Sequence, residues 1–251
     1  MTAVIWIWIA AFGACIGSFL NVVIARLPKG GFLSKARSCC PECGRTIRWF
    51  DLIPVVSFFI LKGRCRDCKA RISPRYPIVE GAGALAAVFC FWMYGLELRA
   101  GLAFGVLMLL LTISLIDLDT VEIPDCLIIA LIPFAAAAAF GWQDITVTER
   151  AIGFFAISLP MLLITLAVSG AFGGGDIKLM AVSGFLLGWK SALAALFIAL
   201  LFGGGYAIFL MASGRRGRGE HMVFGPALCL GISASLLFGS EMIDFYLHLL
   251  M

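Results

Sequence analysis

GLAFGVLMLLLTISLIDLDTVEIPDC, residues 101–126, joins sixteen residues without a charge to a short segment that carries four acids. A helix rises about 1.5 Å per residue and the hydrocarbon core of a bilayer is about 30 Å thick, so apolar runs of this kind are typical of membrane-spanning helices. The stretch therefore predicts a transmembrane helix with carboxylates gathered at one end.

The composition of the chain extends this interpretation. Of its 251 residues, 62% are hydrophobic and 14% are charged, whereas soluble domains have about 45–50% and about 25%. The mean hydropathy is +1.04. These values exclude an ordinary soluble protein, and we predict an all-α polytopic membrane protein with about eight transmembrane helices. The predicted spans cover residues 4–25, 78–96, 101–116, 126–142, 151–171, 177–189, 193–211 and 222–247.

Basic residues are concentrated in one loop. Twelve of the 19 lysines and arginines lie between residues 26 and 75. With eight crossings, Lys178 and the arginines of residues 215–218 fall on the same side as this loop. The basic residues on the opposite side are then Arg99, Arg150 and Lys190. By the positive-inside rule, we expect both termini outside and the loop in the cytoplasm.

Two CxxC pairs, Cys40 with Cys43 and Cys65 with Cys68, lie in this loop with 21 residues between them. Tetrahedral Zn²⁺ binds four thiolates, and each CxxC turn places two sulfurs on one side of the ion. A disulfide or a redox pair is the alternative, but persistent disulfides are rare in a reducing compartment. We predict a structural zinc site, because four cysteines leave no open coordination position.

These features predict three parts of the chain. Residues 1–26 form a first transmembrane helix, residues 27–77 a small cytoplasmic tetra-cysteine zinc-binding domain, and residues 78–251 a seven-helix membrane core. The apolar run at residues 53–61 is too short to span a bilayer. We expect it to pack against the membrane surface or against the helix bundle.

The sequence GGGDIKLM places a second acid, Asp176, behind Gly173, Gly174 and Gly175. Glycines adopt positive φ and let another backbone approach closely, so an extended peptide could lie there. Bulky replacements at Gly173 or Gly175 are then expected to block substrate without disturbing the acid. The alternative is that Asp176 only caps the next helix. We expect Lys178 to face the cytoplasm and to influence Asp176.

Asp176 and the acids of residues 117–125 lie on the same predicted face of the membrane. Acids within spanning segments are usually functional, paired or turned to water. Two carboxylates a few ångströms apart share one proton, so one activates water while the other polarises a carbonyl, as in aspartic proteases. Such a pair needs no catalytic histidine, and the chain has only His221 and His248. A non-enzymatic component, either a proton-coupled transporter or a secretion-machine anchor with a zinc ribbon, is the alternative.

In order and spacing, the motifs resemble the type IV prepilin peptidase family, which are membrane aspartic proteases of the GxGD type. The resemblance covers nearly the whole chain. It is carried by GSFLNVVIARLP at residues 17–28, SCCPEC at 38–43, DLIPVVSFFILKGRCRDCKARISPRYPIVE at 51–80, LIDLDTVEIPD at 115–125, GGGDIKLM at 173–180 and FGPAL at 224–228.

The resemblance implies cleavage of the basic leader peptide of type IV prepilins or pseudopilins at the cytoplasmic face of the bacterial inner membrane. It also implies N-methylation of the new amino terminus with S-adenosylmethionine as donor. Carried onto this chain, the catalytic pair is Asp117 and Asp176, with Asp119 as the alternative to Asp117. The implied partners are these protein substrates and membrane lipid, with no nucleic acid, and the oligomeric state is left open.

Three further acids are candidates for attracting a basic leader. They are Glu80, Glu122 and Asp125. Asp125 follows Pro124, so it is also expected to be the N-cap of the fourth span.

Overall fold

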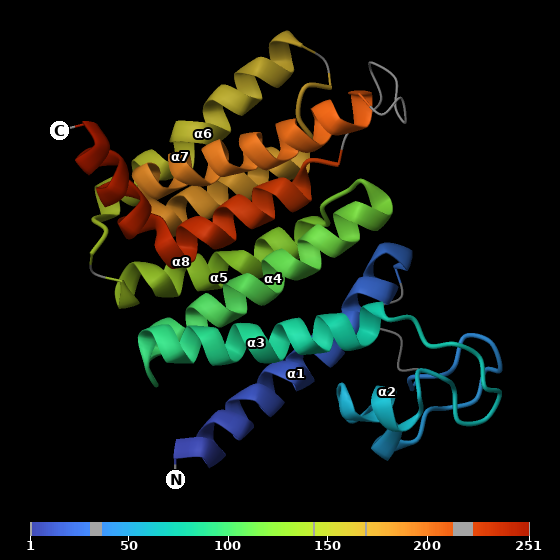
Figure 1. The fold of residues 1–251 in the computed structure, drawn as a ribbon. Coiled ribbons are helices and arrows are strands. Elements are labelled where there is room, and N and C mark those ends of the chain that lie inside the picture. The colour runs from blue at the N-terminus through green and yellow to red at the C-terminus, as the bar shows by residue number, and fades with distance from the viewer. Residues whose placement is uncertain (1, 31–36, 143, 169, 213–222, 251) are drawn as a thin grey trace. The chain divides into compact units, whose positions relative to one another are not determined.

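The computed structural model is all-helical in the part of the chain that it describes, which confirms the predicted fold class (Figure 1). The described residues are 2–30, 37–142, 144–168, 170–212 and 223–250. The predicted basic cluster of Arg215, Arg216 and Arg218, together with His221 and Met222, lies outside them. The elements are α1 (Thr2–Arg26), η1 (Leu27–Lys29), η2 (Trp49–Leu52), α2 (Val56–Ile60), α3 (Arg75–Tyr94), α4 (Leu98–Thr120), α5 (Asp125–Gly141), α6 (Val147–Ala167), α7 (Gly174–Ala212) and α8 (Gly225–Leu250).

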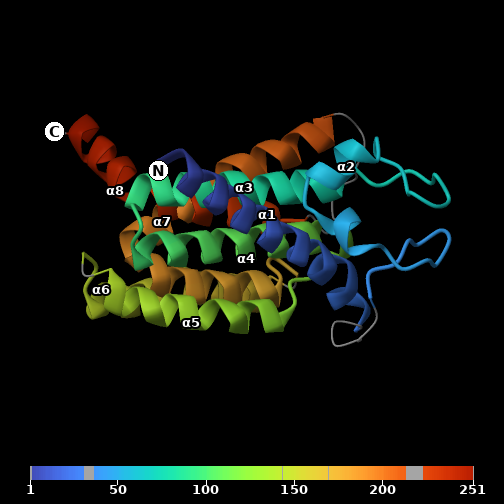
Figure 2. The same cartoon turned by 90° about the horizontal axis from the view of Figure 1, so that it is seen from below.

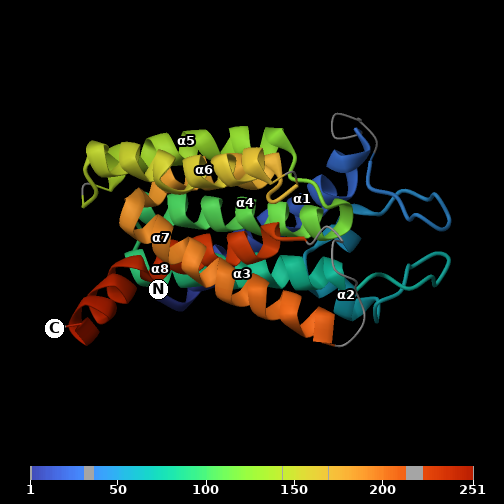
Figure 3. The same cartoon turned by 90° about the horizontal axis from the view of Figure 1, so that it is seen from above.

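The helices confirm a multi-pass membrane protein. Six of the described helices, α1, α3, α4, α6, α7 and α8, are long and apolar enough to cross a membrane, and α5 is a shorter apolar helix. α7 contains two of the predicted spans, which meet at Gly188 with φ 74° and ψ 163°. The loop expected between residues 189 and 193 is therefore absent from α7, because one glycine with left-handed φ turns the chain. Figures 2 and 3 show the two halves of α7 running in opposite directions.

The chain divides into two compact units, residues 1–104 and 105–251, and the boundary falls inside α4. The first unit holds α1, the cysteine-rich segment, α2 and α3. The second holds most of α4 and all of α5 to α8. The domain boundaries predicted at residues 26 and 77 remain predictions.

In the first unit, α1 packs along α3 through two glycines one helical turn apart. A Cβ at Gly13 would lie 2.7 Å from the Cβ of Ala87, and one at Gly17 would lie 2.9 Å from the Cα of Glu80. Small residues at this spacing let helix backbones approach closely in a membrane, where apolar burial alone gives no driving force. The glycines therefore determine where α1 and α3 meet.

In the second unit, α8 packs along the second half of α7. Gly231 abuts the Ala195 backbone and Gly239 abuts the Ser191 side chain. Rising numbers on α8 meet falling numbers on α7, so the two segments are antiparallel. Because α7 has already turned back at Gly188, the first residues of α7 and of α8 lie at the same end of the unit.

Arg150 of α6 is fully buried and joins α5 to the first half of α7. Its guanidinium donates to the carbonyl oxygens of Ala138 and Trp142 at 3.2 and 2.9 Å, and of Phe185 and Leu186 at 3.3 and 2.8 Å. The last carbonyls of a helix have no partner within it, although the Ala138 carbonyl also accepts from the N–H of the C-cap residue Trp142 at 2.8 Å. Arg150 thus caps two helix ends, whereas the sequence had suggested only a charge on the outer side.

Candidate active site

Asp117 is the last residue on the buried face of α4. Val106, Leu110 and Ile113 are fully buried, and Asp117 is 5% exposed. Steps of four, three and four residues keep these side chains on one face of a helix. Asp119, two positions further, is exposed. Burial therefore favours Asp117 as the candidate acid, and the choice between the two remains a prediction.

Asp176 begins the buried face of α7. It is 9% exposed, and Leu179 and Met180, which share its face, are fully buried. The backbone N–H of Gly173 donates to Asp176 Oδ2 at 3.3 Å. α7 starts at Gly174, so Asp176 is the third helical residue and not the N-cap. A carboxylate in the first turn of a helix is stabilised by the helix dipole.

The structure brings Asp117 and Asp176 together. The two side chains are close enough for their charges to interact. The buried thiol of Cys229, on α8, is close enough to interact with both. A pair of acids in an environment with little water holds one proton more readily than none, because two adjacent negative charges repel each other. The arrangement can therefore supply an acid and a base at the same place.

The start of α8 contributes a third group to this site. The backbone N–H of Gly225 donates to Asp117 Oδ2 at 3.0 Å. The rings of Phe172 and Phe224, which precede the starts of α7 and α8, lie 6.0 Å apart between centroids. Sequence reasoning assigned Gly225 no role. The available signal was the Phe-Gly pair that recurs at both helix starts.

The three glycines before Asp176 differ in their surroundings. A Cβ at Gly173 would lie 3.1 Å from Asp176 Oδ2, so the expectation that a replacement there leaves the acid undisturbed is wrong. A Cβ at Gly175 would lie 2.8 Å from the Cβ of Ile123, so packing within the protein accounts for this glycine. Gly174 is exposed and its Cβ position is open. A role in substrate approach stays a prediction, and Gly174 is the position that suits it best.

Lys178 pairs with the start of α5. Its Nζ donates to both carboxylate oxygens of Asp125, at 2.8 and 2.9 Å, and both side chains are more than half exposed. Asp125 is the first residue of α5 and Pro124 occupies the N-cap position, one residue earlier than expected. Asp125 is thus already engaged with a basic side chain, whereas Glu122 is exposed.

Glu80, the third acid expected to attract a leader, is buried in the first unit. Its Oε2 accepts a hydrogen bond from the backbone N–H of Val55 at 2.7 Å. The carboxylate therefore holds the backbone before α2, which is a structural task.

The four predicted metal ligands form one cluster. The Sγ atoms of Cys40, Cys43, Cys65 and Cys68 all lie within 4.8 Å of one another, and those of Cys40 and Cys68 are 3.8 Å apart. A tetrahedral ion with metal–sulfur bonds of about 2.3 Å separates its sulfurs by about 3.8 Å. Backbone N–H groups of Cys43 and Glu42 lower the pKa of the Cys40 thiol to about 7. All nine cysteines are described, and all have free thiols, so the cluster fits a metal ion.

The two cysteine turns have the same backbone design. The N–H of Gly44 donates to the Cys40 carbonyl at 2.9 Å, and the N–H of Lys69 donates to the Cys65 carbonyl at 3.1 Å. Gly44 and Lys69 both have left-handed φ, at 69° and 61°. Each turn therefore presents its two sulfurs in the same way.

Comparison with known families agrees with both sites. The family model described as "Bacterial Peptidase A24 N-terminal domain" matches residues 11–94, which include the cysteine cluster, and the model described as "Type IV leader peptidase family" matches residues 103–208, which include both acids. The chain belongs to the type IV leader peptidase family. The resemblance noted in the sequence is thereby confirmed.

The chain has curated relatives along nearly its whole length. It is 34% identical to "Prepilin leader peptidase/N-methyltransferase" of Bacillus subtilis (strain 168), over 95% of this chain and 96% of the relative. Proteins with the same name from Burkholderia pseudomallei (strain 1026b) and Pseudomonas aeruginosa are 32% and 31% identical over 94% of this chain, and over 85% and 91% of their own lengths. No solved structure matches the chain.

Proposed function

We propose that this type IV leader peptidase is a membrane aspartic endopeptidase that removes the basic leader of type IV prepilins or pseudopilins. We also propose that it methylates the new amino terminus, with S-adenosylmethionine as donor. The name shared by the relatives supports both activities. The main support for the peptidase activity is the pair of buried, interacting acids, Asp117 and Asp176.

In the proposed mechanism the two acids hold one proton. Each acid accepts one backbone N–H, Asp117 from Gly225 at 3.0 Å and Asp176 from Gly173 at 3.3 Å, and such donors favour the ionised form of their acceptor. The shorter bond is the one to Asp117. Asp117 is therefore the base that takes a proton from water as the water oxygen attacks the scissile carbonyl carbon. Asp176 gives its proton to the carbonyl oxygen. The tetrahedral intermediate then collapses: Asp117 protonates the leaving nitrogen, Asp176 recovers a proton from a hydroxyl of the intermediate, and the C–N bond breaks.

The metal in this proposal is Zn²⁺, and its role is structural. Four thiolates complete a tetrahedral sphere and leave no position for water. Cys40 and Cys43 on one turn and Cys65 and Cys68 on the other would hold the ion, which fixes the two turns to each other. The described elements contain no strand that could lead into a nucleotide-binding turn. No step is therefore assigned to residues that bind the methyl donor.

We place the active site and the cysteine cluster on the cytoplasmic side of the inner membrane. The support is the excess of lysine and arginine between residues 26 and 75, together with Lys178 two residues after Asp176.

Three variants test the peptidase assignment. Asp117→Asn and Asp176→Asn should each reduce cleavage to background, because an amide can neither accept nor donate the required proton. Asp119→Asn, at the neighbouring exposed acid, is the matched control and should keep near-normal cleavage. Cleavage of a synthetic prepilin by purified enzyme in proteoliposomes is followed by mass spectrometry, and circular dichroism checks that each variant is folded.

Two results would overturn the assignment. Cleavage by folded Asp176→Asn removes that residue from the mechanism, and loss of cleavage in Asp119→Asn but not Asp117→Asn transfers the role to Asp119. If the protein is instead a transporter, the wild type should not cleave the prepilin. Methyl transfer from labelled S-adenosylmethionine to pre-cleaved substrate tests the second activity separately.

A further inference from the structure

An exposed apolar patch lies on the cysteine-rich segment of the first unit. It is formed by η2 and α2, which pack against each other. Trp49, Phe59 and Ile60 are 80%, 70% and 68% exposed. Contiguous apolar surface of this kind marks an interaction site. The apolar patch consists of Trp49, Phe50, Leu52, Ile53, Val56, Phe59 and Ile60.

The apolar patch is held in place from the second cysteine turn. Arg66 donates three hydrogen bonds to Asp51 of η2 at 2.7, 2.9 and 3.2 Å, and its guanidinium lies 5.2 Å from the centre of the Phe50 ring. The Arg66 side chain keeps the pKa of Asp51 below its usual range by hydrogen bonding. This clamp keeps the aromatic side chains of η2 on the surface.

The depth of the apolar patch follows from its link to a membrane-spanning helix. Glu80 of α3 accepts the Val55 N–H immediately before α2. Glu80 is the sixth residue of α3, so it lies about 8 Å along the helix from Arg75. α2 is therefore level with the first turns of a transmembrane helix. Interfacial apolar faces reach about 5–10 Å into the boundary between headgroups and acyl chains.

The backbone at this link is strained, which shows how firmly it is held. Val55 has φ 62° and ψ −52°, and the Val56 N–H donates to the Pro54 carbonyl at 2.6 Å. A β-branched residue with positive φ persists only where its surroundings enforce it. The Glu80 carboxylate supplies that enforcement.

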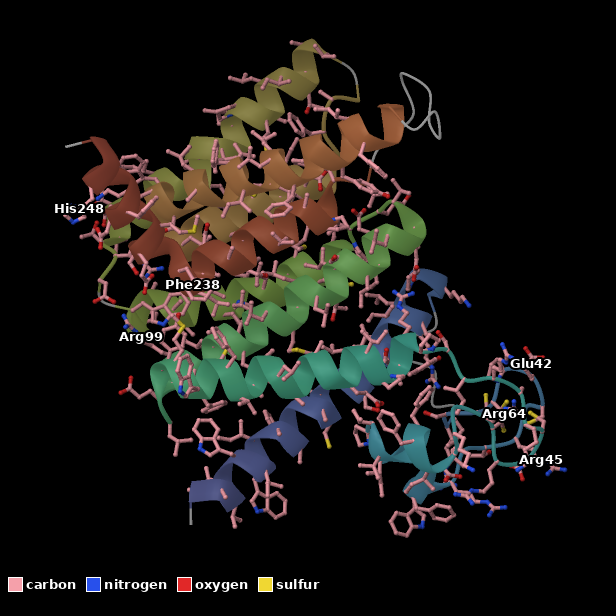
Figure 4. All side chains as sticks on the ribbon, in the orientation of Figure 1. Glu42, Arg45, Arg64, Arg99, Phe238 and His248 are labelled. Atoms are coloured by element: carbon pink, nitrogen blue, oxygen red, sulfur yellow. The ribbon has the colours of Figure 1, made fainter. Side chains whose placement is uncertain are left out.

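Charged residues of the two cysteine turns lie further from the helices (Figure 4). Figure 4 shows Glu42, Arg45 and Arg64 on the two cysteine turns, at the end of the segment away from α1 and α3. Arg48, directly before η2, is more than half exposed. Tryptophan at the interface and arginine near anionic headgroups are typical of residues that contact a bilayer surface. The segment is thus apolar at the level of the helix ends and charged beyond it.

We propose that the apolar patch is seated in the interfacial layer of the bilayer, with phospholipid acyl chains as its ligand. It anchors the metal-binding turns against the membrane surface. A bilayer requires the apolar patch to lie at the same depth as the first turns of α3, which cross the membrane surface. A protein partner would not require this. The inference is independent of the proposed peptidase function.

Quenching of tryptophan fluorescence by brominated phospholipids tests the proposal. Wild type and Trp49→Phe are reconstituted in bilayers with bromine placed either near the headgroups or near the chain ends, and the difference between them isolates the emission of Trp49. We expect this emission to be lost with the shallow bromine and largely kept with the deep one. The matched control is Arg45→Trp in the Trp49→Phe background, which places a tip Trp at the end of the segment away from α1 and α3. The emission of this tip Trp should not be quenched.

A second variant separates lipid from other occupants. Phe59→Glu combined with Ile60→Glu should abolish the shallow quenching of Trp49, because carboxylates leave the acyl layer. Metal content and far-ultraviolet circular dichroism confirm that the variants are folded. If bromine at neither depth quenches the emission of Trp49, the proposal is overturned. Quenching by iodide in the buffer would then indicate a patch exposed to water, and no quenching by iodide would indicate a patch covered by protein. Equal quenching of Trp49 and of the tip Trp, or quenching that survives both glutamates, also overturns it.

Discussion

The first backbone N–H of α8 donates to the Asp117 carboxylate, and the residue that supplies it has no room for a side chain. A Cβ at Gly225 would overlap Asp117 Oδ2 and lie 2.9 Å from its Cγ. The carboxylate cannot move away freely, since Asp117 is buried on a helix. The orientation of the acid therefore depends on a glycine more than a hundred positions away in the chain.

Replacing Gly225 with alanine should inactivate the peptidase without unfolding it. The added methyl would displace the Asp117 carboxylate, and we expect cleavage to fall at least about a hundredfold, as misplaced catalytic groups do. Gly204→Ala is the control, because its Cβ would meet nothing within 4 Å. The measurement is kcat for prepilin cleavage alongside the melting temperature. Full activity in Gly225→Ala would contradict the geometry.

The acids and thiols could be predicted from the sequence, but the groups on other helices that bind the acids could not. Asp117 and Asp176 stand out because carboxylates are costly next to apolar membrane segments. The four cysteines stand out because two CxxC pairs in one loop are rare. The contact from Gly225 to Asp117 joins positions 108 residues apart, and the Lys178 contact to Asp125 spans 53. Such pairs depend on how helices pack, which a local pattern does not encode.

Arg150 donates hydrogen bonds to carbonyl oxygens at helix ends, which membrane lipid could not do. Its four acceptors, all carbonyl oxygens, terminate α5 and the first half of α7. No water is present in hydrocarbon to bond such groups, so each unsatisfied carbonyl costs several kcal/mol. The guanidinium suits the task because its donors spread in a fixed fork.

Arg150→Met should destabilise the second unit by on the order of 3 kcal/mol, because the apolar chain fills the space but donates no hydrogen bond to these carbonyls. Lys190→Met is the control: Lys190 pairs with Glu149 at 3.5 Å on the surface, and such pairs contribute at most about 1 kcal/mol. Thermal unfolding in one detergent compares the two. Equal melting temperatures for both variants would show that Arg150 is dispensable.

The apolar segments were predictable as elements, but their ends were not. α4 runs four residues beyond the predicted end at residue 116, because acids on a helix end do not stop a helix, and it ends where Val121 takes left-handed φ. α6 begins at Val147 after a capping box between Thr146 and Glu149, which hydropathy alone overlooks. Hydrophobicity locates a span, whereas capping chemistry sets its limits.

Each compact unit carries one kind of chemistry, the thiol cluster in residues 1–104 and the acid pair in residues 105–251. Every contact given above for Asp117 and Asp176 comes from within the second unit. Losing the metal should therefore loosen the first unit and leave the acid pair in place.

Removing the metal with a chelator should open residues 37–73 to protease while residues 105–251 stay intact. The ion would fix the two cysteine turns to each other, and small metal-dependent folds open when their metal is removed. Cys40→Ser should reproduce the effect, whereas Cys39→Ser, at the exposed neighbour outside the cluster, should not. Mass spectrometry locates the cuts and elemental analysis counts the metal. Unchanged proteolysis of metal-free protein would refute a structural role.

The early turn at Gly188 makes the first half of α7 a short one. Residues 174–187 rise about 21 Å, against about 30 Å of hydrocarbon. A helix with this hydrophobic mismatch draws the bilayer thinner around it, at a cost that grows with membrane thickness. Since Asp176 lies at the end of this helix, bilayer thickness should control how easily water reaches the acids. We expect cleavage to accelerate in lipids with shorter acyl chains and to slow in thicker membranes, so the lipid around the enzyme would act as a regulator of its rate.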